Sequence, residues 1–198
     1  MSINNFFILA SGSKSRILIL KNLGLNFAIK QHKIDEKLYK KSFTTLKYSP
    51  KKISLQLAKN KAKNIKTNNT LVIGSDTVIN FNGNIIEKAK TLLGAKKKIK
   101  KLSGKTHTII SSAAAYFNNQ LVWCCSQEAK VKLRKLNDQE IKEYLKSCKP
   151  DILNCVGCYQ VEKNGAIIIE RIEGDFFTVM GFPLFPFLFF LKKFNVKK

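Results

Sequence analysis

The sequence predicts an α/β fold in which helices flank one mixed, twisted β-sheet. Short apolar runs of strand type alternate along the chain with segments of helical periodicity, and no repeat or long linker interrupts them. Hydrophobic residues make up 44% of the 198 residues, which is ordinary for a chain that buries a core. No change in composition marks a boundary, so we expect a single domain over residues 1–198.

The N-terminal part predicts a strand, a Gly/Ser turn and a helix. Residues Asn5–Ala10 form the apolar run, and Ser11-Gly12-Ser13 ends it. Apolar residues at near-helical spacing follow over Ser15–Leu23, and Gly24 is placed to end that helix. A turn of this kind points backbone N–H groups at whatever lies above it, where the helix dipole favours an anion.

The remaining elements alternate in the same way. Further strands are expected at Phe27–Gln31, Leu71–Phe81, Ile85–Ile86, Thr106–Phe117, Leu121–Leu133, Gly157–Val161 and Ala166–Ile172. Helices are expected at Ser54–Ile65, Thr91–Leu102 and Asn137–Ser147, and a last one within Val179–Phe190. Asn-Gly pairs between apolar runs predict tight hairpin turns at residues 82–83 and 164–165.

The charge balance is strongly basic. The chain has 36 Lys and Arg against 13 Asp and Glu, a net charge of +23, which favours nucleic-acid, acidic-membrane or phosphate partners. All but three of the basic residues are lysines, whereas specific nucleic-acid readers depend on arginine. Two interpretations of the lysine excess stay open: it reflects the codon bias of an AT-rich genome, or it forms a polyanion-binding surface. The lysines are spread over most segments without an aromatic-and-arginine stacking pattern, so no stable nucleic-acid partner is expected.

Five cysteines are present, an odd number, without a segment of signal-peptide type. Reduced thiols in a cytosol fit this better than a disulfide framework, so we expect a cytoplasmic protein. Cys155 and Cys158 form a C-x-x-C pair with no second pair at zinc-ribbon spacing. Either they have a metal or redox role, or they are small buried side chains beside Gly157.

The Phe182–Leu191 segment is very apolar, but it has about half the length that a membrane-spanning helix needs. We therefore expect a buried terminal helix and no membrane partner. An interfacial anchor is the alternative, supported by four nearby lysines: Lys192, Lys193, Lys197 and Lys198.

The loop Ser11–Arg16 is the first candidate for chemistry. It combines hydroxyls, backbone N–H groups, a helix N-terminus and one of only three arginines, which suits a polyphosphate. The spacing is not that of a Walker A loop. Plain capping of the following helix is the alternative interpretation.

Asp76 is the second candidate, because it directly follows an apolar strand, where ligands usually bind in an α/β sheet. Its carboxylate could hold a divalent cation or take a proton from water, or it could cap a local turn. Lys88, after the first predicted hairpin, could neutralise phosphate or lie solvated on the surface.

Seven blocks, in order from residue 9 to residue 184, resemble the Maf family of nucleotide pyrophosphatases. They are Leu9-Ala10-Ser11-Gly12-Ser13-x-x-Arg16, Asp35-Glu36, Leu57-Ala58-x-x-Lys61-Ala62, Gly74-Ser75-Asp76-Thr77-Val78, Leu102-Ser103-Gly104-x-Thr106-His107, Gly157-Cys158-Tyr159 with Glu170-Arg171-Ile172-Glu173-Gly174-Asp175, and Gly181-Phe182-Pro183-Leu184. The resemblance implies a Maf/ITPase-like fold with two lobes around a central cleft, commonly as a homodimer.

The resemblance also implies an activity: cleavage of nucleoside triphosphates between the α and β phosphates, which removes non-standard or excess nucleotides. It implies a divalent cation, Mg²⁺ or Mn²⁺, and makes Asp76 the proton acceptor. Five further residues fall on its phosphate- and metal-site positions, with the metal assigned to the carboxylate: Ser11, Arg16, Lys61, Lys88 and Glu36. The Ser13 amide and hydroxyl would help to position the phosphate chain.

The positions that select the base are mixed. Pyrimidine-directed members resemble this chain at Thr77, but they have an arginine where it has Ser15. Pyrimidine-directed members also have a glutamine where this chain has Glu162, unless Gln160 has shifted into that role, whereas members directed at 7-methyl-GTP resemble this chain at Glu162. A rival hypothesis from another class is a basic nucleic-acid-binding or septum-associated regulatory protein without turnover.

Overall fold

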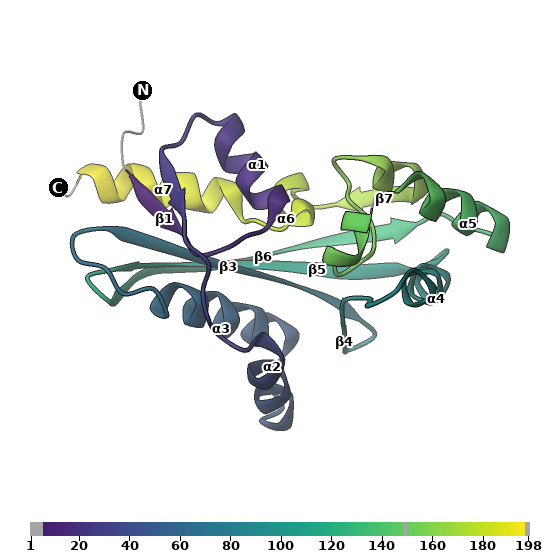
Figure 1. Ribbon diagram of the computed structural model, residues 1–198, viewed down its shortest axis with the longest axis horizontal. Helices are drawn as coiled ribbons and strands as arrows, with labels where there is room; N and C mark the ends of the chain where they lie inside the picture. The colour runs from purple at the N-terminus through teal and green to yellow at the C-terminus, as the bar shows by residue number, and fades with distance from the viewer. Residues whose placement is uncertain (1–5, 149, 197–198) are drawn as a thin grey trace. The chain divides into compact units, whose positions relative to one another are not determined.

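The computed structural model describes residues 6–148 and 150–196, and it has a seven-stranded mixed sheet flanked by helices (Figure 1). The strand order is β2-β1-β3-β5-β6-β7, with β4 paired to β3. The predicted α/β class is confirmed. The strands are β1 Phe7–Leu9, β2 Phe27–Ile29, β3 Leu71–Phe81, β4 Asn84–Ile86, β5 Thr106–Phe117, β6 Gln120–Leu133 and β7 Ile169–Glu173. Asn5, predicted to open the first strand, lies outside the described residues.

The helices follow the predicted order, with additions. They are α1 Lys14–Asn22, α2 Glu36–Thr45, α3 Pro50–Lys63, α4 Leu92–Leu102, α5 Asp138–Ser147, α6 Phe176–Met180 and α7 Leu184–Val196, with 3-10 helices η1 Pro150–Asn154 and η2 Asn164–Ile168. Gly24, with φ of +65°, follows α1 as predicted.

The described residues divide into two compact units. One comprises residues 6–77, 111–127 and 181–196, and the other comprises 78–110 and 128–180 without residue 149. The single domain and the cleft expected from the sequence stay predictions.

In the first unit, β1 lies between β2 and β3 and is parallel to both. Helices α1 and α7 lie on one side of these strands, and α2 and α3 lie on the other (Figure 1). A Cβ at Gly74 in β3 would come within 2.1 Å of the Ala58 carbonyl oxygen of α3. The helix therefore runs against the strand at a distance that only glycine permits, and it brings Ser54 and Lys61 to Asp76 in the middle of β3.

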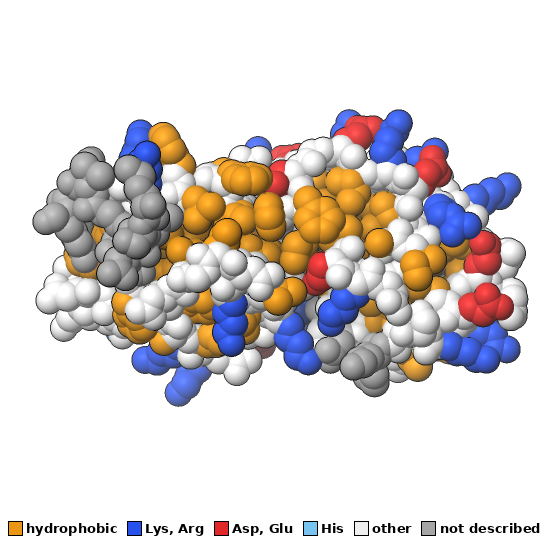
Figure 2. Space-filling model, turned by 90° about the horizontal axis from the view of Figure 1, so that it is seen from above, with side chains coloured by type: hydrophobic (Ala, Val, Ile, Leu, Met, Phe, Trp, Pro, Cys, Tyr) orange, Lys and Arg blue, Asp and Glu red, His pale blue; other side chains and the backbone are white. Residues whose placement is uncertain are grey.

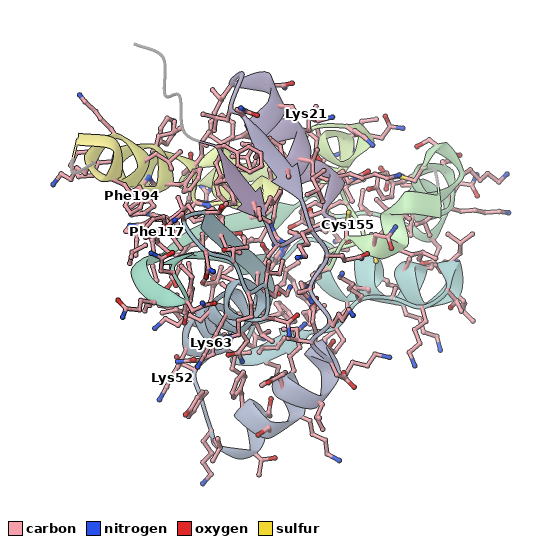
Figure 3. All side chains as sticks on the ribbon, turned by 60° about the vertical axis from the view of Figure 1, so that its left-hand side comes forward. Lys21, Lys52, Lys63, Phe117, Cys155 and Phe194 are labelled. Atoms are coloured by element: carbon pink, nitrogen blue, oxygen red, sulfur yellow. The ribbon has the colours of Figure 1, made fainter. Side chains whose placement is uncertain are left out.

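Aromatic contacts hold α7 against strands β5 and β6 within the first unit. Trp123 and Phe190 stack with ring centroids 5.0 Å apart, and Phe117 meets Phe194 edge-on at 5.5 Å (Figure 3). Most of the predicted terminal segment is buried, but Phe185 and Phe189 are 60% and 61% exposed. Lys197 and Lys198, named for the alternative anchor, lie outside the described residues.

No helix in the described ranges is long and apolar enough to cross a membrane. On the face seen in Figure 2, lysine and arginine side chains are scattered singly or in small groups, with acidic side chains among some of them.

The second unit has its own apolar core. The β3–β4 hairpin turns at Asn82-Gly83, with φ of 52° and 81°, as the sequence predicts. His107 and Tyr159 are both buried here, and their Nε2 and Oη atoms are 2.5 Å apart. Burial lowers the pKa of His107 to about 4.

The predicted hairpin around residues 164–165 is wrong. Residues 157–161 form turns rather than a strand, because Cys158 adopts a left-handed φ of 57° and the Gln160 carbonyl accepts the N–H groups of Lys163 and Gly165. Only residues 169–172 of the second predicted strand are extended, as part of β7, which pairs antiparallel with β6 instead.

Helix α2 was not predicted from the sequence. It buries no residue completely, so it shows no apolar stripe of the usual kind. Its beginning is specified by Asp35, whose side chain accepts hydrogen bonds from the N–H groups of Lys37 and Leu38.

Candidate functional site

Asp76 is a buried carboxylate that Lys61 holds in place. The Lys61 Nζ atom lies 2.7 Å from Asp76 Oδ1 and 3.0 Å from Glu36 Oε1, so the ammonium group bridges two carboxylates. The side chains of Lys61 and Asp76 are 5% and 4% exposed, whereas that of Glu36 is 33% exposed. The structure thus brings together three residues that the sequence analysis placed at one site.

The other oxygen of Asp76 has a different environment. Oδ2 is buried and makes no hydrogen bond within the described part of the chain. The Asp76 backbone is fixed separately, since its carbonyl accepts the Ser54 hydroxyl at 3.0 Å. A buried carboxylate oxygen without a protein partner, on a rigid strand, is suited to accept a hydrogen bond or a proton from a bound water.

Arg16 forms a second cluster with neutral acceptors. Its Nε donates to the Gly181 carbonyl at 2.8 Å, Nη1 donates to Ser11 Oγ at 3.0 Å, and Nη2 donates to Thr77 Oγ1 at 2.9 Å. A guanidinium has five N–H donors, and acceptors among the described residues take three of them. The other two are on the terminal nitrogens Nη1 and Nη2, the groups with which arginine binds phosphate oxygens.

The Arg16 guanidinium is desolvated but lies in a field that favours its charge. Burial lowers its pKa, and the negative charges of Asp76 and Glu36 oppose that shift. The Arg16 guanidinium is therefore close enough to Asp76 and Glu36 for their charges to act on it.

Strand alternation explains why there are two clusters. Successive side chains of a strand point to opposite faces, so Asp76 and Thr77 diverge although they are neighbours in sequence. The Asp76 face meets α3 through Lys61, and the Thr77 face meets Arg16 of α1. Figure 1 shows these helices on opposite sides of β3.

The Ser-Gly-Ser loop joins β1 to α1. The Ser11 hydroxyl accepts both from Arg16 and from the Ser13 N–H, at 3.3 Å for the latter. Ser13 is the N-cap of α1, but its side chain makes no capping hydrogen bond. Ser15 lies half-buried in the first turn of that helix.

Three predicted residues belong to the second unit. Lys88 is exposed, whereas Gln160 and Glu162 are half-buried in the turns that replace the predicted strand. Lys88 and Glu162 both act electrostatically on Cys155, whose pKa is raised to about 11, chiefly by burial. A protonated thiol of this kind is unreactive at neutral pH.

Three residues near the site escaped the sequence analysis. His32 Nε2 lies 3.4 Å from Glu36 Oε1, and its spacing of four residues from Glu36 was the only signal. Ser111 Oγ lies 3.0 Å from Thr77 Oγ1, and a serine in the middle of an apolar strand was its signal. The carbonyl of Gly181 left no signal, because backbone acceptors are the same at every residue.

The carboxylates fit a divalent cation only in combination with a ligand. Within residues 6–148 and 150–196, no three His, Cys, Asp or Glu side chains are placed to hold a metal ion. Mg²⁺ is commonly held by one or two carboxylates together with substrate phosphates and water, and the partly exposed Glu36 provides such a carboxylate.

Comparison with known proteins gives a consistent family. The family model described as Maf-like protein matches residues 6–194. The chain is 40% identical over 191 residues to the 7-methyl-GTP pyrophosphatase of Bartonella henselae, covering 96% of each protein. It is 36% identical over 177 residues to the dTTP/UTP pyrophosphatase of Thermotoga maritima, covering 89% of this chain and 83% of that protein. It is 34% identical over 185 residues to the nucleoside triphosphate pyrophosphatase of Caulobacter vibrioides, covering 93% of each. With matches of this extent along nearly its whole length, the chain belongs to the Maf-like protein family.

Proposed function

We propose that this chain is a nucleoside triphosphate pyrophosphatase that cleaves the bond between the α and β phosphates, giving a nucleoside monophosphate and pyrophosphate. The observation that carries the proposal is the buried Asp76, whose Oδ1 is held by Lys61 while Oδ2 has no partner within the described residues. The names of the related proteins support the same reaction class.

In this proposal Asp76 is the proton acceptor. Water attacks the α-phosphorus, the P–O bond to the β-phosphate breaks, and Oδ2 takes the proton that the water loses. Lys61 keeps the carboxylate in one orientation and offsets its charge, so that the site is organised before substrate binds.

Arg16 is proposed as a cation for the phosphate chain, because its guanidinium lies within electrostatic reach of Asp76 and Glu36. The two remaining guanidinium donors would contact phosphate oxygens, and the Ser13 region would contribute the N-terminus of α1. Lys88 is proposed as a further cation for the triphosphate.

Glu36 is the proposed protein ligand of a divalent cation, Mg²⁺ or Mn²⁺, shared with phosphate oxygens of the substrate. When bound, the cation would offset charge that develops on those oxygens. Removing divalent ions with a chelator is expected to stop turnover, and adding Mg²⁺ or Mn²⁺ is expected to restore it.

Pyrophosphate release tests the reaction. The purified chain, with Mg²⁺ or Mn²⁺, is expected to release pyrophosphate rather than orthophosphate from a member of a set comprising dTTP, UTP, CTP and 7-methyl-GTP. Asp76→Asn is expected to lower kcat by about 10²-fold or more. Asp138→Asn is the matched control, because Asp138 makes an exposed ion pair with Lys100. Activity of Asp76→Asn equal to that of the control would remove Asp76 from the mechanism.

The same screen addresses the choice of base. Relatives named for 7-methyl-GTP and for dTTP/UTP are 40% and 36% identical to this chain, so both nucleotide types belong in the set. Ser15, Thr77, Gln160 and Glu162 are the proposed selecting positions.

The rival regulatory protein is tested in parallel. It predicts no turnover of any nucleotide, together with nucleic-acid binding that weakens steeply as salt rises. The homodimer implied by the resemblance stays a prediction, which sedimentation of the purified chain tests.

A further inference from the structure

The Thr77 hydroxyl has its whole hydrogen-bonding capacity occupied by protein groups. It can donate one proton and accept two hydrogen bonds. Its Oγ1 atom lies 2.9 Å from Arg16 Nη2, 3.1 Å from the Gly181 carbonyl oxygen and 3.0 Å from Ser111 Oγ. The three contacts match the three capacities.

The chemistry of the partners fixes the direction of each hydrogen bond. The Arg16 guanidinium can only donate, and the Gly181 carbonyl can only accept. Thr77 therefore gives its proton to Gly181, and the Ser111 hydroxyl must donate to the remaining lone pair of Thr77. Ser111 is fully buried in β5, so this direction is set by the protein and not by solvent.

The Gly181 carbonyl accepts hydrogen bonds from side chains of the same cluster. It accepts from Arg16 Nε at 2.8 Å, from Thr77, and from Ser75 Oγ at 3.5 Å. Gly181 has φ of +109°, and a Cβ there would lie 3.2 Å from Thr77 Oγ1. Four segments of the chain thus meet at the side of β3 that carries Arg16.

We propose that Ser111 is a positioning residue for phosphate binding: its hydroxyl orients Thr77, and Thr77 orients the Arg16 guanidinium so that its two remaining donors face the substrate. This rests on the proposed function. Ser111 touches neither substrate nor Asp76, which lies on the other face of β3, so its removal should weaken binding and leave the chemical step nearly unchanged.

Ser112 offers a matched control in the same strand. It is also fully buried, and its hydroxyl lies 2.8 Å from Ser126 Oγ, on the opposite face of β5 from Ser111. Ser111→Ala and Ser112→Ala each delete one buried hydroxyl that contacts another hydroxyl. A general loss of packing would affect both variants alike.

The experiment compares these variants with Ser111→Thr, which retains a hydroxyl. KM and kcat are measured for the best nucleotide of the screen, and the Kd for inorganic tripolyphosphate is measured by calorimetry. For Ser111→Ala, KM and Kd should rise roughly three- to tenfold, with kcat within about twofold of native. Ser112→Ala should match the native protein, and Ser111→Thr should recover most of the binding.

Equal KM and Kd values for Ser111→Ala and Ser112→Ala would overturn the proposal, as would a fall in kcat at unchanged KM. If the native chain binds tripolyphosphate but releases no pyrophosphate, the proposed function fails while the Kd comparison still decides the role of Ser111. A native chain that neither binds tripolyphosphate nor turns over a nucleotide overturns both.

Discussion

Replacing Lys61 by methionine should reveal how strongly the buried charges depend on one another. The substitution keeps most of the aliphatic volume but removes the ammonium group 2.7 Å from Asp76 Oδ1. Asp76, with a side chain only 4% exposed, would lose the ammonium group that offsets its charge. Breaking a buried ion pair by removing one partner costs roughly 3–5 kcal/mol, so the free energy of unfolding should fall by about that amount.

The double substitution Lys61→Met with Asp76→Asn is the decisive measurement. The asparagine amide carries no charge, so the double variant has no buried carboxylate without a cation. It should therefore recover most of the stability that Lys61→Met loses. Urea unfolding at pH 7 gives the four free energies of the cycle. Lys63→Met, two residues further along α3 and exposed, is the control and should change stability by less than about 0.5 kcal/mol. A loss below about 1 kcal/mol for Lys61→Met, or no recovery in the double variant, would refute the electrostatic account.

Two further outcomes are expected. Burial lowers the pKa of His107 from 6.5 to about 4, so the folded chain keeps it neutral where the unfolded chain binds a proton. Its contribution to stability is present above pH 6.5 and is lost as the pH falls towards 4, by roughly 3 kcal/mol. His107→Gln should remove this share of the pH dependence in urea unfolding between pH 7 and 4; a slope equal to that of the native chain would contradict the assignment. Gly74→Ala should destabilise the chain by about 2 kcal/mol or more, because its Cβ would lie 2.1 Å from the Ala58 carbonyl oxygen. Thermal unfolding of this variant measures the loss, and a native melting temperature would show that α3 is free to move away.

The order of strands and helices followed largely from apolar periodicity and turn residues. The turn at Asn82-Gly83 could be predicted, because Asn and Gly adopt the left-handed backbone conformation that such a turn requires. Residues 157–161 misled the same reasoning, since Cys158 is left-handed although its residue type does not favour that conformation. Helix α2 was missed because its boundary depends on the Asp35 cap rather than on an apolar face.

The candidate site was predictable residue by residue but not contact by contact. The sequence predicted Asp76 at the end of an apolar strand, but it lies in the middle of β3, which continues to Phe81. The resemblance supplied Lys61 and Glu36. Nothing in the sequence indicated that Arg16 donates three hydrogen bonds to neutral protein groups, because those acceptors belong to residues up to 165 positions away. The contact of Ser111 with Thr77 could be identified only from the tertiary structure, which places β5 beside β3.

The divergence of Asp76 and Thr77 across β3 has a consequence for how such an enzyme can change. One residue proposed for catalysis and one proposed for substrate choice are adjacent in the gene, yet each has a separate set of partners. A substitution at position 77 would change the contacts of Arg16 and Gly181 while the Asp76–Lys61 pair stays intact. On the proposed assignment, the pleat of a single strand would let substrate binding vary among descendants that retain one reaction.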